Sequence, residues 1–143
     1  MKLILASLCA LFVFAGCDTL QNASNSTGTV FSLNGQWKLT SNLPENTLTG
    51  SVVTVAPFIS EGKLTVLANN TQCYRENDVK WKDIVTDKAG GFTMNNLLAS
   101  CTGGTLNYQP ATIKVVNADE IRIVGKNVAG VENTQVWTRI RMN

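Results

Sequence analysis

The residue types that enzymes use for acid–base chemistry are sparse in this chain. It has no histidine, so Ser-His-Asp and Cys-His arrangements are excluded and the usual general base near neutral pH is missing. Glu76 with Asp78 or Asp83 is the candidate carboxylate pair for glycoside hydrolysis, which needs two such groups on either side of one bond. The run Glu-Asn-Asp at 76–78 is also typical of a solvated turn, and we prefer this interpretation. We therefore expect no catalytic residues, no cofactor and no metal site in a protein that is not an enzyme.

Residues 1–17, MKLILASLCALFVFAGC, indicate export from the cytoplasm. One basic residue precedes an apolar run that is too short for a membrane helix, which needs about 20 residues, so the pattern favours a cleaved signal peptide. Residues 14–17, Phe-Ala-Gly-Cys, resemble a bacterial lipobox, in which small residues precede a cysteine that is acylated and becomes the first mature residue. The resemblance implies a lipoprotein signal peptide at residues 1–16 and a lipid anchor on Cys17; a plain signal peptide with an incidental cysteine is the alternative.

Several acyl chains on one residue hold a protein firmly to a bilayer. We therefore expect a lipid-anchored protein of the cell envelope, either periplasmic or surface-facing and in the outer membrane, with the bilayer as its partner through acylated Cys17. Residues 17–31, which include a run rich in Ser, Thr and Asn, are predicted to be the lipidated cysteine and a flexible tether. Asp18-Thr19-Leu20 resembles the O-glycosylation signal of Bacteroidetes. The folded domain is predicted at residues 32–143.

Two cysteines remain for the folded domain once Cys9 is removed with the signal peptide and Cys17 is acylated. An even pair in an exported chain predicts a disulfide, here between Cys73 and Cys101. Such a cross-link is expected to add about 3–4 kcal/mol to the free energy of unfolding. A zinc site is the weaker alternative, because two thiols without histidine make a poor ligand set.

The charge balance argues against a nucleic-acid partner. The chain has 12 basic and 10 acidic residues, a formal net charge of +2, which is too weak for a nucleic-acid or anionic-surface footprint. The hydrophobic content of 44% is ordinary for a globular domain. We expect one domain and a monomer.

The rest of the sequence indicates strands and turns. Alternating or β-branched apolar patterns predict strands at residues 36–40, 51–55, 63–67, 79–85, 92–94, 105–108, 111–116, 120–125 and 134–140. Residues 97–101 suit either a strand end or a short helical turn. About eight short strands without a long amphipathic helix predict an all-β domain, a single antiparallel meander that closes into a small barrel.

Two details of these strands are also predicted. Pro110 cannot sit in a central ladder, which suggests an edge or a bend between residues 105–108 and 111–116. In the segment 79–85, alternation predicts two faces of the strand. One face carries Val79, Trp81 and Asp83, and the other carries Lys80, Lys82 and Ile84.

The first and last strands carry a familiar pair of motifs. Gly35-Gln36-Trp37 begins the first strand of the domain, and Arg139 lies on the last one, with Arg141 as the second choice. Lipocalins and related calycins have Gly-x-Trp and a C-terminal arginine in these places, and the chain resembles the lipocalin-like lipoproteins of Bacteroidetes. The resemblance implies that Arg139 packs across Trp37 and closes one end of a barrel, a contact worth about 0.5–2 kcal/mol.

Two functions follow as hypotheses. The first is a lipid-anchored lipocalin-like barrel that binds a small apolar or amphipathic ligand, with Phe58 and Ile59 as candidate residues at the ligand entrance. The alternative is an interaction or structural lipoprotein whose filled barrel contacts an envelope protein or glycan without a small-molecule ligand. An eight-stranded barrel has space for either, since its interior suits packed side chains or one small ligand.

Overall fold

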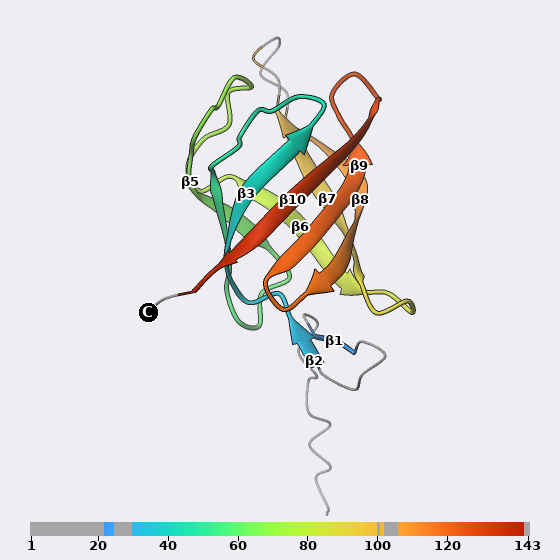
Figure 1. The fold of residues 1–143 in the computed structure, drawn as a ribbon. Helices are drawn as coiled ribbons and strands as arrows, with labels where there is room; N and C mark the ends of the chain where they lie inside the picture. The colour runs from blue at the N-terminus through green and yellow to red at the C-terminus, as the bar shows by residue number, and fades with distance from the viewer. Residues whose placement is uncertain (1–21, 25–29, 100, 102–105, 142–143) are drawn as a thin grey trace, which may run out of the picture.

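The computed structural model describes residues 22–24, 30–99, 101 and 106–141, and these residues form strands, turns and loops without a helix. Eight strands close into one antiparallel barrel in the order β10-β3-β4-β5-β6-β7-β8-β9 (Figure 1). Their bounds are β3 (Gly35–Leu43), β4 (Val52–Val55), β5 (Gly62–Val66), β6 (Val79–Thr86), β7 (Phe92–Ala99), β8 (Leu106–Asn117), β9 (Glu120–Lys126) and β10 (Glu132–Ile140). The predicted all-β antiparallel barrel is confirmed.

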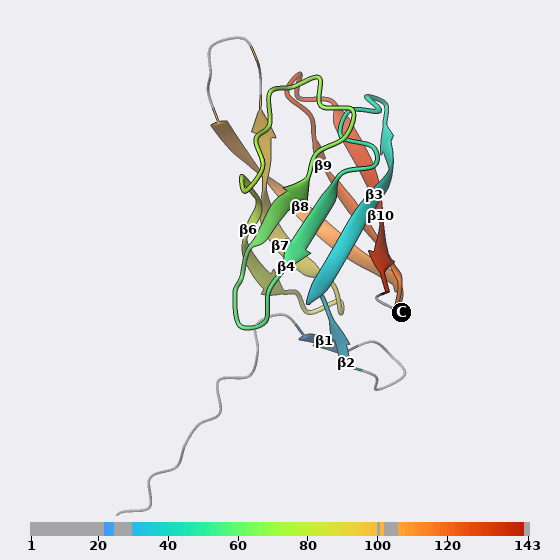
Figure 2. The ribbon, with the colours of Figure 1, turned by 90° about the vertical axis from the view of Figure 1, so that its left-hand side faces the viewer.

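Neighbouring strands run in opposite directions, so the connections gather at two ends of the barrel (Figure 2). Two short strands, β1 (Asn22–Ser24) and β2 (Val30–Ser32), pair with each other beneath one end, which we call the lower end. The other lower-end connections are residues 56–61, 87–91 and 118–119. The opposite, upper end holds the loops at residues 44–51, 67–78 and 127–131.

Large side chains from opposite walls fill the middle of the barrel. The rings of Trp81 and Trp137 meet edge to face, with centroids 5.0 Å apart. Gly62 leaves room for this packing, because a Cβ there would lie 2.7 Å from the Trp81 ring. Every barrel strand contributes at least one apolar side chain with 0% exposure, among them Trp37, Val53, Leu64, Trp81, Phe92, Ile113, Ile121 and Trp137. A side chain beside a water-sized void would keep accessible surface, so protein atoms occupy the space around these residues.

A bulge at the start of β6 buries Lys80 beside Trp81. Gly62 of β5 pairs with Trp81, but the next residue, Lys63, pairs with Val79, which leaves Lys80 as an extra residue in β6. An extra residue breaks the alternation of faces. Lys80 and Trp81 are consequently both buried, and their predicted placement on opposite faces is wrong.

A second bulge follows in the same strand. The register of β6 with β7 shifts between Lys82 and Val85, where Asp83 has a φ of 55°. Ile84 is buried and Asp83 is exposed. The prediction that Ile84 faces away from the tryptophan side fails for the same reason, since simple alternation holds only where no residue is inserted.

Strand β8 is longer than the sequence predicted. Residues 105–108 and 111–116 were expected to flank an edge or a bend at Pro110. Pro110 lies within one strand, β8, and pairs with Asn95 of β7. The pairing of β8 with β9 begins only at Thr112. Pro110 therefore occupies a stretch that is paired on one side, where its missing amide leaves the β8–β9 ladder intact.

The start of the domain also differs from the prediction. The predicted tether at residues 17–31 includes β1 and part of β2, and Phe31 is a core residue with 7% exposure. Its ring centroid lies 6.1 Å from that of Trp37 and 6.2 Å from that of Phe92. The apolar core thus begins one residue before the predicted boundary at residue 32, because Phe31 packs onto the lower end.

The disulfide between Cys73 and Cys101 is confirmed. Its Cα atoms lie 5.2 Å apart and the two residues are separated by 28 positions in the sequence. Cys101 follows β7, which extends to Ala99, so the strand-end alternative for residues 97–101 fits better than a helical turn. The bond joins the long upper loop at residues 67–78 to the upper end of β7.

Candidate functional site

The lower end of the barrel is closed by Arg139. Its guanidinium carbon lies 4.2 Å from the ring centroid of buried Trp37, which is a cation–π contact. The same group donates hydrogen bonds to the carbonyl oxygens of Ser32, Asn34 and Ala118, at 2.6, 2.5 and 3.0 Å. Arg139 therefore joins the chain entering β3 to the β8–β9 turn, across the face of the tryptophan.

The glycine of the Gly-x-Trp motif has a steric role at this contact. Gly35 has a φ of 124°, and a Cβ there would lie 3.1 Å from the Nη1 atom of Arg139. A side chain at residue 35 would thus strain the backbone and press on the guanidinium. Arg141, the second choice for this contact, instead forms an ion pair with Asp119.

Phe58 and Ile59, the candidate ligand-entrance residues, lie in the loop between β4 and β5 at this same lower end. The loop leaves β4 after Val55, and Val55 pairs with Gly35. Their side chains are 84% and 45% exposed. The prediction required an entrance at the end opposite the Trp37–Arg139 closure. The structure instead places both residues at the same end as this closure.

The candidate carboxylates lie in the turn before β6 and on β6 itself. Asp78 accepts a hydrogen bond from the amide of Arg75 at 2.8 Å within a turn, and Glu76 is exposed in the same turn. Asp83 is exposed and accepts a hydrogen bond from the side chain of Asn95 at 2.9 Å. Asp78 thus stabilises the turn that we preferred on sequence grounds.

The predicted lipidation site, Cys17, and the Asp18–Leu20 motif lie outside the described residues. In the part of the chain that the structure describes, no helix is long and apolar enough to span a membrane. The described residues also contain no cluster of three or more His, Cys, Asp or Glu residues that could hold a metal ion.

The upper half of the barrel interior contains a buried amine. Lys80 has 0% exposure, and its ammonium group donates hydrogen bonds to the main-chain oxygen of Leu97 at 2.5 Å and the side-chain oxygen of Asn96 at 2.9 Å. The phenol oxygen of Tyr74 lies 3.5 Å away and the Tyr74 ring centroid 4.9 Å away. All three partners are uncharged, so they replace the hydration of the ammonium only in part.

Burial changes the protonation of both side chains. Loss of hydration lowers the pKa of Lys80 from 10.5 to about 7, and the nearby carboxylate of Glu45 opposes this change. Burial raises the pKa of Tyr74 from 10.0 to about 12, so its phenol stays protonated at neutral pH. Lys80 in the folded protein therefore titrates close to neutral pH.

Buried amides and one carboxylate connect the upper loops above Lys80. Asn133 of β10 donates to the side-chain oxygen of Asn42 at 2.8 Å, and both residues are buried. Glu45 accepts hydrogen bonds from Asn127 at 2.9 Å and from Gln72 at 3.3 Å. Because these partners lie in two different loops, Glu45 links three upper connections of the barrel.

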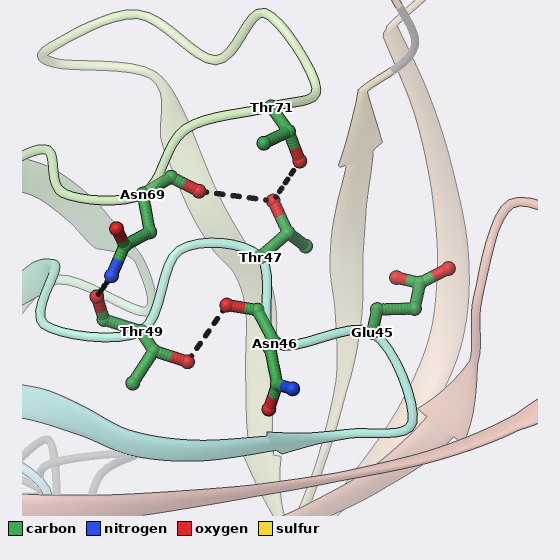
Figure 3. A pocket seen from close by; sticks show the side chains of 6 residues that line it. All are labelled: Glu45, Asn46, Thr47, Thr49, Asn69 and Thr71. Atoms are coloured by element: carbon green, nitrogen blue, oxygen red, sulfur yellow. Dashed lines mark hydrogen bonds between the residues drawn. The ribbon is translucent and has the colours of Figure 1, made fainter.

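A polar groove opens between two of these loops (Figure 3). Its volume is about 460 Å³ and its lining residues are Glu45, Asn46, Thr47, Thr49, Asn69 and Thr71. The hydroxyl of Thr71 donates to that of Thr47 at 3.0 Å, and the amide of Asn69 donates to the carbonyl of Thr49 at 2.7 Å. The carboxylate of Glu45 points away from the loop backbone beside this space (Figure 3). The groove offers hydroxyl, amide and carboxylate groups on a surface that lies opposite the Trp37–Arg139 closure.

Several residues of the same loops have positive φ values, and one of them, Leu48, is strained. Asn46, Leu48 and Asn69 have φ values of 56°, 62° and 46°. Leu48 is also buried, and a branched apolar residue at positive φ is rarely tolerated. Such strain often accompanies a functional surface.

Sequence reasoning missed this upper site. Asn42, Asn96 and Asn133 interrupt apolar strands at positions that turn out to be buried, and these interruptions were the available signal. Lys80 left no such signal, because its burial depends on a bulge that the alternating pattern conceals.

Comparisons with known proteins leave the site to be interpreted from its own geometry. A scan against protein-family models, a search of curated proteins and a search of solved structures each found no match to this chain.

Proposed function

We propose that the protein is a lipid-anchored lipoprotein of the cell envelope, with a lipocalin-like barrel whose upper groove binds an envelope glycan. The observation that carries the proposal is a barrel filled by side chains, combined with a polar groove of about 460 Å³ at one end. The anchor on Cys17 and the lipocalin-like relationship rest on sequence motifs.

The chemistry of the groove favours a glycan over a protein partner. All six lining side chains are polar and can donate or accept hydrogen bonds, which matches the hydroxyl and amide groups of envelope sugars. Protein interfaces usually depend on a central aromatic or aliphatic anchor, and the lining set has none. We expect weak binding because the lining offers no aromatic face for a sugar ring to stack on.

A titration of the protein with soluble oligosaccharides from bacterial envelopes, followed by amide NMR, tests the proposal. Signals from residues 45–49 and 69–71 are expected to shift at millimolar sugar. Asn46→Gly removes an exposed groove amide while suiting the φ of 56°, and should weaken binding several-fold. Thr65→Val, on the exposed Thr54–Thr65 pair of β4 and β5, is the matched control and should bind normally.

Two results would count against the glycan site. One is an absence of shifts with every sugar tested, and the other is shifts confined to surfaces outside the groove. Recovery of an envelope protein crosslinked at residue 46 in intact cells would instead favour a protein partner.

The anchor is tested separately from the groove. The mature protein should have the mass of an acylated chain that begins at Cys17, and Cys17→Ala should move it from the membrane fraction to the soluble fraction. An unmodified cysteine in membrane-free protein would disprove the anchored function.

A small amphipathic ligand is the second candidate function, and Lys80 is the observation that favours it. The side-chain oxygen of Asn96 and the phenol of Tyr74 surround its amine, and an anionic head group would suit this site if the loop at residues 67–78 opened. Native mass spectrometry after mild extraction, together with uptake of a fluorescent fatty acid, tests this function. A ligand-free protein that takes up no probe would exclude it.

A further inference from the structure

We propose that the loop at residues 56–61 contacts the bilayer surface and holds the barrel with its upper groove facing away from the membrane; this inference rests on the acylation of Cys17 in the proposed function. The loop presents Phe58 and Ile59 to solvent at the lower end, with side-chain exposures of 84% and 45%.

The position of the anchor brings the lower end close to the lipid. The described chain begins at Asn22 of β1, which lies beneath the barrel (Figure 2). Cys17 precedes Asn22 by five residues, and a fully extended chain of this length spans at most about 17 Å. The lower end is thus confined to the neighbourhood of the bilayer, whichever path the intervening residues take.

The conformation and exposure of Phe58 lower the stability of the fold. Its φ is 63°, a region that suits glycine or asparagine and penalises a bulky side chain. Among the residues that the structure describes, it is also the most exposed of the large hydrophobic ones. Strain and exposure together indicate a residue that contacts something outside the domain, and an aromatic ring is well suited to the membrane interface.

The rest of the lower rim is compatible with a lipid surface. Three further exposed apolar residues, Val85, Val116 and Ile140, lie at the lower ends of their strands. The charged residues of this end are mixed in sign, with Glu61, Asp87 and Asp119 against Lys88, Arg139 and Arg141. We therefore expect a contact that depends on apolar insertion and not on anionic lipid.

Exposed apolar residues also occur at the upper end, and they supply the control. Val128 is 50% exposed in the loop at residues 127–131, at the end of the barrel away from β1. If the tether sets the orientation, this residue stays in water even when the protein is bound to a vesicle.

The test uses the full chain, expressed with its leader and purified in acylated form. Phe58→Cys and Val128→Cys are each labelled with an environment-sensitive fluorophore, while Cys73 and Cys101 remain paired in their disulfide. The proteins are placed on phosphatidylcholine vesicles with and without brominated acyl chains. The label at residue 58 should shift to the blue and be quenched by bromine at both low and high salt, whereas the label at residue 128 should do neither.

The outcomes separate the two proposals. An acylated chain that floats with the vesicles but leaves the residue 58 label unquenched, or quenches the residue 128 label equally, overturns the membrane-facing loop alone. A chain that is not acylated and does not float overturns the anchored function and this inference with it. Quenching at residue 58 that appears only with anionic lipid overturns the apolar mode of contact.

Discussion

At the lower end of the barrel the cation of Arg139 lies on the face of Trp37 and donates to three carbonyl oxygens, whereas at the upper end the cation of Lys80 is enclosed among uncharged oxygens. Arg139 remains partly exposed, and Lys80 has no exposed surface. A delocalised guanidinium tolerates this partial loss of water better than an ammonium group does. The comparison indicates that the lower end contributes stability, while the upper end retains polar groups at some cost to it.

The largest expected effect comes from the lower end. Trp37→Ala removes a fully buried indole and should lower the free energy of unfolding by about 3–5 kcal/mol. Tyr74→Phe at the upper end removes a phenol that donates to the main-chain oxygen of Leu97 and lies 3.5 Å from the ammonium group of Lys80. It should cost about 1–2 kcal/mol. Denaturant midpoints measure both, and equal losses would remove the proposed contrast between the ends.

The disulfide is expected to compensate for the weaker upper end. Replacing both Cys73 and Cys101 with serine should lower the free energy of unfolding by about 3–4 kcal/mol, because the unfolded chain regains the entropy of an open loop. Hydrogen exchange should then rise first in residues 67–78 and leave the amides near Trp37 protected. Uniform loss of protection across the barrel would show that the two ends unfold as one unit.

Lys80 predicts an unusual pH dependence. Its pKa is about 7 in the folded protein against 10.5 for an unburied lysine, so the unfolded chain binds more protons between these values. The free energy of unfolding should therefore rise with pH above about 7, by about 2 kcal/mol between pH 7 and pH 9. Below pH 7 the contribution of Lys80 to this free energy should stay at its lowest value.

The matched variants for this effect are Lys80→Met and Lys63→Met. Lys63 is exposed on β5, so its replacement should keep the pH dependence of the original protein, whereas Lys80→Met should flatten it. Thermal or denaturant unfolding at several pH values gives the comparison. A curve unchanged by Lys80→Met would mean that the amine is hydrated in solution.

The sequence was informative where residues interact locally or through a known motif, and less so where the chain departs from regular alternation. Strand periodicity located the barrel strands, and Gly35, Trp37 and Arg139 marked the lower end. The burial of Lys80 follows from an inserted residue in β6, which no spacing rule reveals. The groove lies between two loops whose lining residues are 20 or more positions apart in the sequence, as Thr49 and Asn69 are. Its geometry therefore depends on how the barrel closes.

The smallest effect tests whether the glycine of the lower-end motif acts through Arg139. Gly35 and Gly130 both have positive φ, at 124° and 78°, but only a Cβ at residue 35 would approach another group, the Nη1 atom of Arg139 at 3.1 Å. Gly130→Ala should cost about 1 kcal/mol from backbone strain alone, and Gly35→Ala about 1–2 kcal/mol. Only Gly35→Ala should also change the near-ultraviolet circular dichroism, because displacement of the guanidinium alters the surroundings of the Trp37 indole. An unchanged spectrum would mean that Arg139 adjusts to the new methyl group, and the glycine would then be required for its backbone conformation and not for the contact.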